Sequence, residues 1–118
     1  MGEAYVADLN KIAKDNVVWL KVLHTTPQQQ ITVMSIPAYM EIGEEVHKRS
    51  SQFTYIVEGN AVAIVGGEMY NLNKGYGIYI PKDTPHNIIN QSAMSLKLYS
   101  IYTPPVHHAG EVQLYKRE

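Results

Sequence analysis

Short runs rich in β-branched and aromatic residues, each followed by a turn signal, recur along almost the whole chain. Such residues favour strands, and the glycine and proline residues between the runs favour turns. The turn signals recur about every eight to twelve residues, which is typical of an antiparallel sandwich or barrel. We therefore predict an all-β fold of roughly nine short strands with little helix. The runs that predict strands are 17–24, 28–36, 41–59 with a turn through 48–51, 60–65, 68–72, 76–80, 86–90 and 94–102.

The predicted strands form a single domain, because a chain of 118 residues can bury one core but not two. We place a barrel at residues 17–110, an N-terminal arm at residues 1–16 and a C-terminal tail at residues 111–118. The arm could hold a short helical turn around Leu9, with Asp8 as its cap. A double-sheet jelly roll, also described as a double-stranded β-helix, fits this pattern of strands.

Composition argues against several kinds of partner. The formal net charge of -1 gives no electrostatic reason to expect nucleic acid or an anionic membrane. No apolar run approaches the length needed to span a bilayer, and the acidic start of the chain is unlike a secretory signal. The chain has no cysteine, so it can form neither a disulfide nor a thiolate site. We expect a cytoplasmic protein with a small-molecule ligand and with no nucleic-acid or membrane partner.

The stretch 41–59 carries the side chains with the clearest chemistry. If it is extended, Glu45 and His47 lie on the same face, and a turn through residues 48–51 can bring Gln52 beside them. A buried, unpaired Glu45 would cost several kcal/mol, and a divalent cation would compensate for it. His86, which opens a later predicted strand, could supply a fourth ligand.

The spacing of these residues resembles the two sequence motifs of the cupin family. The matching patterns are Glu45-x-His47-x4-Gln52-x6-Gly59 for the first motif and Gly75-x5-Pro81-x-Asp83-x2-His86-x3-Asn90 for the second. The resemblance covers residues 17–110 and implies a cupin jelly-roll barrel. Small single-domain, RmlC-like cupins, often labelled as similar to mannose-6-phosphate isomerase, resemble this chain in more detail. The shared segments are the runs 42–47, 52–53 and 99–105.

The chain departs from the usual motifs at four positions. The usual first motif supplies His-x-His-x3-4-Glu, whereas here Glu45 replaces the first histidine and Gln52 replaces the glutamate. Tyr39 and Asp83 stand where the motifs have glycine. The resemblance therefore implies a metal shell that keeps a single carboxylate but moves it. This shell consists of Glu45, His47, Gln52 and His86.

A shell of oxygen and nitrogen donors without sulfur suits iron(II), manganese(II), nickel(II), cobalt(II) or zinc. Such a metal could polarise a sugar carbonyl or enediol for isomerisation, or support oxidation of an oxygenated acid by dioxygen, and both reaction types occur among cupins. Two alternatives stay open at this point. The barrel could bind a small ligand without turning it over, or it could be a metal-free, epimerase-like cupin that uses a histidine as base and a tyrosine as acid.

Some of these residues also have simpler explanations. Glu45 lies next to Glu44 and could belong to a solvated acidic face, although its parity with His47 argues against this. For His107 and His108, a solvent-exposed tail is favoured over a lid or a second metal position.

Strand alternation also bears on assembly. Since Gln52 should face the site, Phe53, Tyr55 and Val57 should point away from it and need other cover. A second sheet, the N-terminal arm or another subunit could provide this cover. With apolar residues on both faces of several strands, we expect a homodimer that exchanges edge strands.

Overall fold

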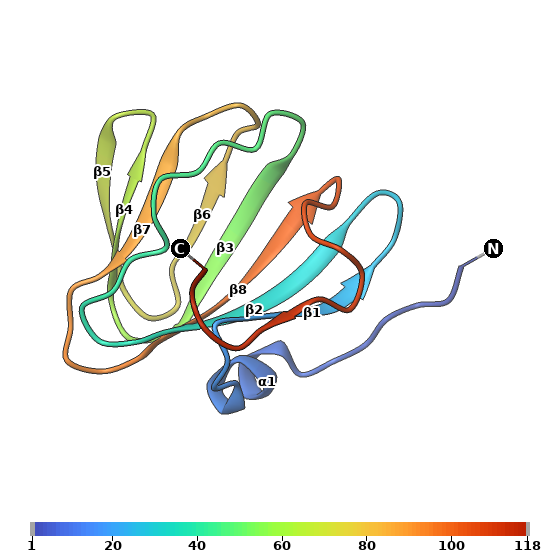
Figure 1. Cartoon of the computed structure of the whole chain (residues 1–118), viewed down its shortest axis with the longest axis horizontal. Coiled ribbons are helices and arrows are strands. Elements are labelled where there is room, and N and C mark those ends of the chain that lie inside the picture. Colours follow the sequence, from blue (N-terminus) through green and yellow to red (C-terminus); the bar gives the residue numbers. More distant parts are fainter. Residues whose placement is uncertain (1, 118) are drawn as a thin grey trace.

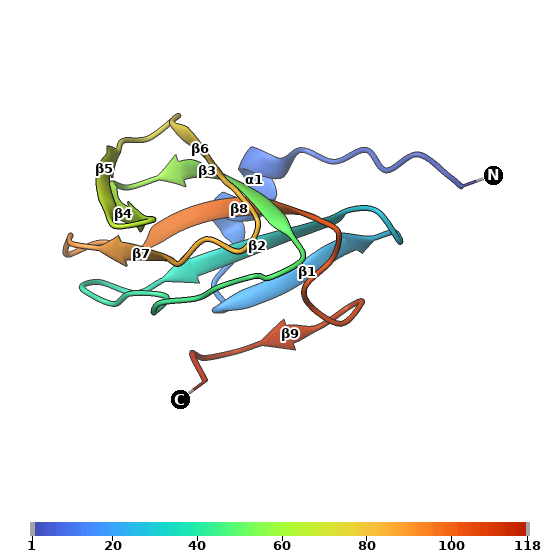
Figure 2. The ribbon, with the colours of Figure 1, turned by 90° about the horizontal axis from the view of Figure 1, so that it is seen from above.

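The computed structural model describes residues 2–117, and its secondary structure confirms the all-β prediction. Two antiparallel sheets face each other in a jelly roll, with one short helix outside them (Figures 1 and 2). The larger sheet has the order β6-β3-β8-β2-β1-β9, and the smaller has the order β5-β4-β7. The elements are α1 (Leu9–Asp15), β1 (Leu20–Thr25), β2 (Gln30–Ile36), β3 (Ser51–Glu58), β4 (Ala61–Val65), β5 (Glu68–Leu72), β6 (Gly77–Ile80), β7 (His86–Asn90), β8 (Leu96–Thr103) and β9 (Val112–Gln113).

The interior of the barrel is polar at one end and apolar at the other. This division follows from the register of β3, β8 and β2, whose inward side chains form rows across the three strands. Two rows are polar, Gln52–Tyr102–Gln30 and Thr54–Ser100–Thr32, and the next is apolar, Ile56–Leu98–Met34. All nine side chains are buried. The apolar end forms the main core with residues from the smaller sheet, and the polar end is left to face the site.

Helix α1 covers part of the outer face of the larger sheet. Asp8 caps it as expected, because its side chain accepts a hydrogen bond from the Lys11 backbone N–H at 3.1 Å. Ala13 is fully buried in a small cluster with Val33 and Val57, so the N-terminal arm provides some of the cover that the outward side chains need. Phe53, on the same face, stays exposed. The homodimer remains a prediction, since a single chain does not test it.

The C-terminal residues, expected to be a tail, run along the free edge of β1 (Figure 2). Strand β9 pairs with Leu20 and Lys21. On either side of it, the Trp19 N–H donates to the Leu114 carbonyl at 3.2 Å and the Val22 N–H donates to the Glu111 carbonyl at 2.9 Å. These bonds fix the position of the chain up to Leu114. Within residues 2–117 no helix has the length and hydropathy to cross a membrane.

Candidate metal centre

The segment between β2 and β3 carries Glu45 and His47, and it is held against β7 by backbone hydrogen bonds. The Glu45 N–H donates to the His86 carbonyl at 2.8 Å, and the His86 N–H donates back to the Glu45 carbonyl at 2.9 Å. One residue pair further on, the Asp83 N–H donates to the His47 carbonyl at 2.7 Å. The two predicted motifs are therefore tied together at the residues expected to act as ligands.

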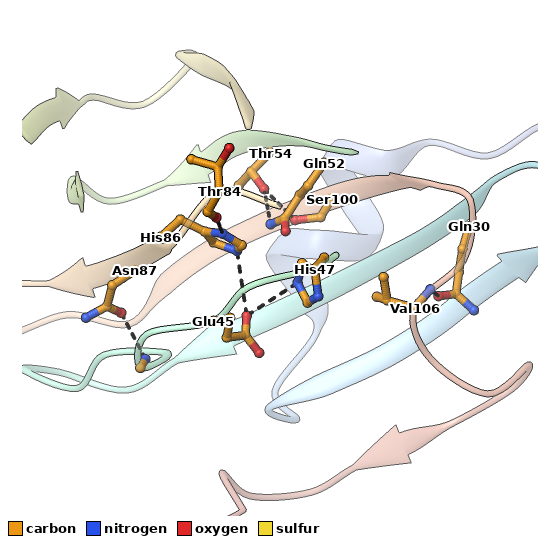
Figure 3. A network of polar contacts seen from close by, with 11 residues as sticks. Gln30, Glu45, His47, Gln52, Thr54, Thr84, His86, Asn87, Ser100 and Val106 are labelled. Carbon is orange, nitrogen blue, oxygen red and sulfur yellow. Dashed lines mark hydrogen bonds and ion pairs between the residues drawn. The ribbon is translucent and has the colours of Figure 1, made fainter. Parts of the chain in front are cut away.

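The side chains of Glu45, His47 and His86 converge at the polar end of the barrel (Figure 3). One ligand atom from each lies within 4.8 Å of the other two. The Glu45 Oε1 atom lies 3.8 Å from His47 Nε2 and 3.9 Å from His86 Nε2. These separations are too long for hydrogen bonds, and they leave room for an ion between the three groups.

Hydrogen bonds on the far side of two of the side chains set their orientation. The His86 Nδ1 atom lies 2.9 Å from the Thr84 carbonyl, to which it donates, so the lone pair of Nε2 faces the cluster. The Gln52 amide donates through Nε2 to Thr54 Oγ1 at 2.9 Å, and Thr54 Oγ1 lies 2.7 Å from Ser100 Oγ. This bond uses the NH₂ group of Gln52 and leaves its Oε1 atom without a partner.

Three of the inward atoms have no hydrogen-bond partner although they are buried. They are His47 Nε2, Gln52 Oε1 and His86 Nε2, and Thr32 Oγ1 is the other such side-chain atom among residues 2–117. Buried polar atoms are nearly always paired, so a group of unpaired acceptors in one place is informative. Three acceptor atoms and a carboxylate facing one space form a donor set that fits a cation.

The pKa values of His47 and Glu45 are also compatible with cation binding. Burial, followed by the neighbouring His86 and His107, lowers the pKa of His47 from 6.5 to about 4, so His47 is neutral at neutral pH. Burial raises the pKa of Glu45 above its ordinary value, and His86 partly opposes this rise. The carboxylate therefore lacks a cationic protein partner strong enough to offset its burial.

A cavity of about 220 Å³ adjoins the cluster at Glu45, the one proposed ligand that lines it, and extends to the C-terminal segment. Glu45, Tyr102 and His107 line it. The Tyr102 ring packs edge-on against His47, with centroids 5.6 Å apart, and against His107, with centroids 5.4 Å apart. Burial raises the pKa of Tyr102 and lowers that of His107.

The expectation of a solvent-exposed tail was therefore wrong for His107, which is half-buried, although His108 is exposed. The buried Gln30 side chain holds the His107 backbone in place: its Nε2 donates to the His107 carbonyl at 2.8 Å, and its Oε1 accepts from the His107 N–H at 2.9 Å. The sequence contained one signal for this contact. Gln30 has the strand parity of the inward-facing side chains of β2, and a buried glutamine needs partners.

Together the fold and the site define a jelly-roll barrel with a candidate metal centre at its polar end. Residues 32–102 match the family model described as the cupin domain, and the chain belongs to the cupin family. This match confirms the resemblance inferred from the two motifs.

Several known proteins are similar to this chain. YrkC of Bacillus subtilis, described as an uncharacterised protein, is 34% identical over 97% of the chain, which spans 64% of the length of YrkC. The uncharacterised protein L612 of Acanthamoeba polyphaga mimivirus is also 34% identical, over 95% of the chain and 72% of its own length.

Among solved structures, BH2720 from Bacillus halodurans superposes with a TM-score of 0.94 at 33% identity, covering 97% of this chain and 91% of that one. KdgF from Halomonas sp. superposes with a TM-score of 0.68 at 22% identity, covering 74% and 78% of the two chains. The likeness to KdgF concerns the fold alone.

Proposed function

We propose that this cupin binds a divalent transition metal through a Glu45 carboxylate oxygen, His47 Nε2, Gln52 Oε1 and His86 Nε2. The observation that carries the proposal is the set of three buried, unpartnered atoms that face the Glu45 carboxylate. Without a cation, each of these atoms would lose its hydrogen bonds to water and gain nothing in return, which costs about 1–3 kcal/mol for each atom.

The donor set suits iron(II), manganese(II), nickel(II), cobalt(II) or zinc, since it offers two imidazoles and two oxygens without sulfur. Four protein ligands leave one or two positions for a substrate if the metal is five- or six-coordinate. The metal would supply Lewis-acid activation of a substrate oxygen. The proposed substrate is a small sugar or an oxygenated acid. We also propose that the chain belongs with the small cupins labelled as similar to mannose-6-phosphate isomerase.

The residues around the cavity support an enzyme over a passive binding protein. His107 has a lowered pKa, so its imidazole is neutral and can accept a proton from a bound molecule at neutral pH. Burial raises the pKa of Tyr102, so its phenol stays protonated and can donate a hydrogen bond. A neutral imidazole and a protonated phenol at one cavity are the groups that proton transfer to and from a substrate would use.

The metal-free, epimerase-like alternative draws support from one observation. His47 and Glu45 form a histidine–carboxylate pair at 3.8 Å, and Tyr102 lies beside them. This arrangement could transfer protons without a metal. The metal-free hypothesis, however, gives no role to the unpaired atoms Gln52 Oε1 and His86 Nε2. In the metal hypothesis both atoms are ligands.

Elemental analysis of the untagged protein, purified without chelator, tests the proposal. We expect close to one transition-metal ion per chain in the wild type and almost none in a Glu45→Ala, His86→Ala double variant. His108→Ala serves as the matched control, because it removes an exposed histidine that does not line the cavity. Circular dichroism would establish that each variant is folded. A wild-type protein without metal after reconstitution, or a double variant that keeps it, would refute the proposal.

A further inference from the structure

The cavity beside the candidate metal centre has a cationic side that the cupin motifs do not supply. Lys116 and Arg117 of the C-terminal segment line it together with Glu45, which is its single acidic lining residue. Both lie outside the stretch 32–102 that matches the cupin domain. The chain that leads to them is fixed up to Leu114, because β9 and the bonds around it hold the C-terminal segment on β1.

Lys116 is held across the cavity by contacts that leave its charge available. Its Nζ atom donates to the Glu41 carbonyl at 2.8 Å and lies 5.9 Å from the centroid of the Trp19 ring. Among residues 2–117 no carboxylate oxygen lies within 4.0 Å of Lys116 or Arg117. A half-buried ammonium that contacts a carbonyl and an aromatic ring still favours an anion.

The charge around the cavity becomes strongly positive once a metal is bound. A divalent cation more than neutralises Glu45, and Lys116 adds a further half-buried positive charge. Arg117 adds another at the exposed rim, where the hydrogen bond from Gln113 and, more weakly, the Arg117 charge lower the pKa of the Glu111 carboxyl. In a partly enclosed site such an excess is weakly screened, so a neutral ligand would leave it uncompensated. An anionic ligand would compensate it.

The size and walls of the cavity limit the ligand further. A volume of about 220 Å³ holds about seven water molecules at about 30 Å³ each. Trp19, Leu20, Met34 and Ile42 supply the apolar part of the cavity wall. A short carbon chain would contact this wall while its two ends reach polar groups.

We infer that the cavity binds a small organic anion, which chelates the metal through oxygen atoms at one end and presents a carboxylate or phosphate to Lys116 and Arg117 at the other. This inference rests on the proposed metal function and narrows its substrate class. The C-terminal segment thus selects the ligand, and the motif residues hold the metal.

Three chelators with the same metal-binding head test the inference on the cobalt(II)-loaded protein. Acetohydroxamate has no anionic tail, succinic monohydroxamate ends in a carboxylate, and phosphonoacetohydroxamate ends in a phosphonate. The visible absorption of cobalt reports the binding of each. We expect one of the anionic chelators to bind at least about tenfold more tightly than acetohydroxamate, as a charge-assisted hydrogen bond in a cavity would give. The better tail shows whether carboxylate or phosphate is preferred.

A Lys116→Met, Arg117→Gln variant should no longer bind the anionic chelator more tightly than acetohydroxamate. Its cobalt content and its affinity for acetohydroxamate should stay unchanged. A Lys116→Arg, Arg117→Lys exchange should keep the preference for the anionic chelator, since both charges remain. The matched control is Lys11→Met, Lys74→Met, which removes two exposed positive charges that do not line the cavity. Equal binding of the three chelators by the wild type, or a preference that survives in the first variant, would overturn the inference. If the protein takes up no cobalt, the proposed metal function fails and the inference fails with it. If cobalt is bound but no chelator alters its spectrum, the inference fails and metal binding stands.

Discussion

Thr54 determines which atom of the Gln52 side chain faces the candidate metal centre. A glutamine amide can rotate by half a turn and exchange its oxygen for its NH₂ group, and the NH₂ group cannot bind a metal. The bond from Gln52 Nε2 to Thr54 Oγ1 favours the orientation with Oε1 inward, and the short contact of Thr54 with Ser100 holds the hydroxyl in place.

We therefore predict that Thr54→Val weakens metal binding about tenfold or more, the usual effect of removing a residue that orients a ligand. Competition with a fluorescent chelator would measure the metal dissociation constant. Thr32→Val is the matched control: Thr32 lies in the same cross-strand row, but its hydroxyl has no partner. The same affinity in both variants would show that Thr54 does not orient Gln52.

Tyr39 and Asp83 show that a motif can keep its backbone while it changes its residues. The resemblance placed both where cupin motifs have glycine, and both have positive φ, 60° at Tyr39 and 57° at Asp83. This left-handed region is the usual reason for a glycine, and aspartate tolerates it better than tyrosine does. The Asp83 turn also delivers the hydrogen bond to His47. At these two positions the residues differ from the glycines of the cupin motifs, but the backbone adopts the left-handed conformation that a glycine would favour.

At the scale of elements, α1 is separate from the site. It packs on the outer face of the larger sheet, and the candidate metal centre lies at the polar end of the interior. Stability contributed by the helix should therefore be independent of metal binding.

We predict that Asp8→Ala lowers the free energy of unfolding by about 1 kcal/mol, the typical cost of losing a helix N-cap. The metal dissociation constant should stay unchanged. Urea denaturation of the metal-free protein measures the first quantity, and chelator competition measures the second. Asp15→Ala, which removes only an exposed ion pair with Lys11, should cost much less. An equal loss in the two variants would mean that the cap does not stabilise α1.

The strands illustrate how much of the fold could be predicted from the sequence. Runs 68–72 and 86–90 match β5 and β7 to the residue, because a Gly-Gly turn and a Pro-bounded turn mark their ends. The stretch from residue 41 was expected to be extended before and after a turn at residues 48–51. Strand β3 does begin at Ser51, but the earlier residues make only single bridges, at Glu41 and Glu45. The bridge to β7 brings Glu45 and His47 together with His86.

Strand β9 and the cationic side of the cavity could not be predicted locally. Val112–Gln113 has only two residues, and its conformation depends on the free edge of β1, about ninety residues earlier in the chain. Alternation and turn signals report local structure, and they carry no information about such a contact. For the same reason, sequence patterns identified Glu45, His47, Gln52 and His86 as candidates but missed His107, Lys116 and Arg117.

For the whole molecule, the polar end of the barrel makes stability depend on pH in the absence of metal. The pKa of His47 in the folded chain is about 4, below its ordinary 6.5. Between these values the unfolded chain binds a proton that folded His47 does not, so the contribution of His47 is fully present above pH 6.5 and is lost as the pH falls toward 4. Glu45 acts in the opposite sense, because its raised pKa lets the folded chain take up a proton first.

We predict that the difference in unfolding free energy between the metal-free wild type and His47→Gln shrinks from pH 7 to pH 4. The change is at most about 3 kcal/mol, given about 1.4 kcal/mol for each unit of pKa shift, and the titration of Glu45 itself cancels because both proteins contain it. Urea denaturation at several pH values would measure it. A difference that stays constant with pH would mean that His47 titrates normally in the folded protein.

The pairing of β9 with β1 also has a consequence for solubility. A sheet edge with free N–H and C=O groups is a template for strands of other molecules, and proteins commonly cover such edges. Here residues 111–114 occupy the edge of β1 from Trp19 to Val22, so the segment that carries Lys116 and Arg117 to the cavity also covers this edge. Any variation of the C-terminal segment that alters ligand choice therefore has to preserve this protection.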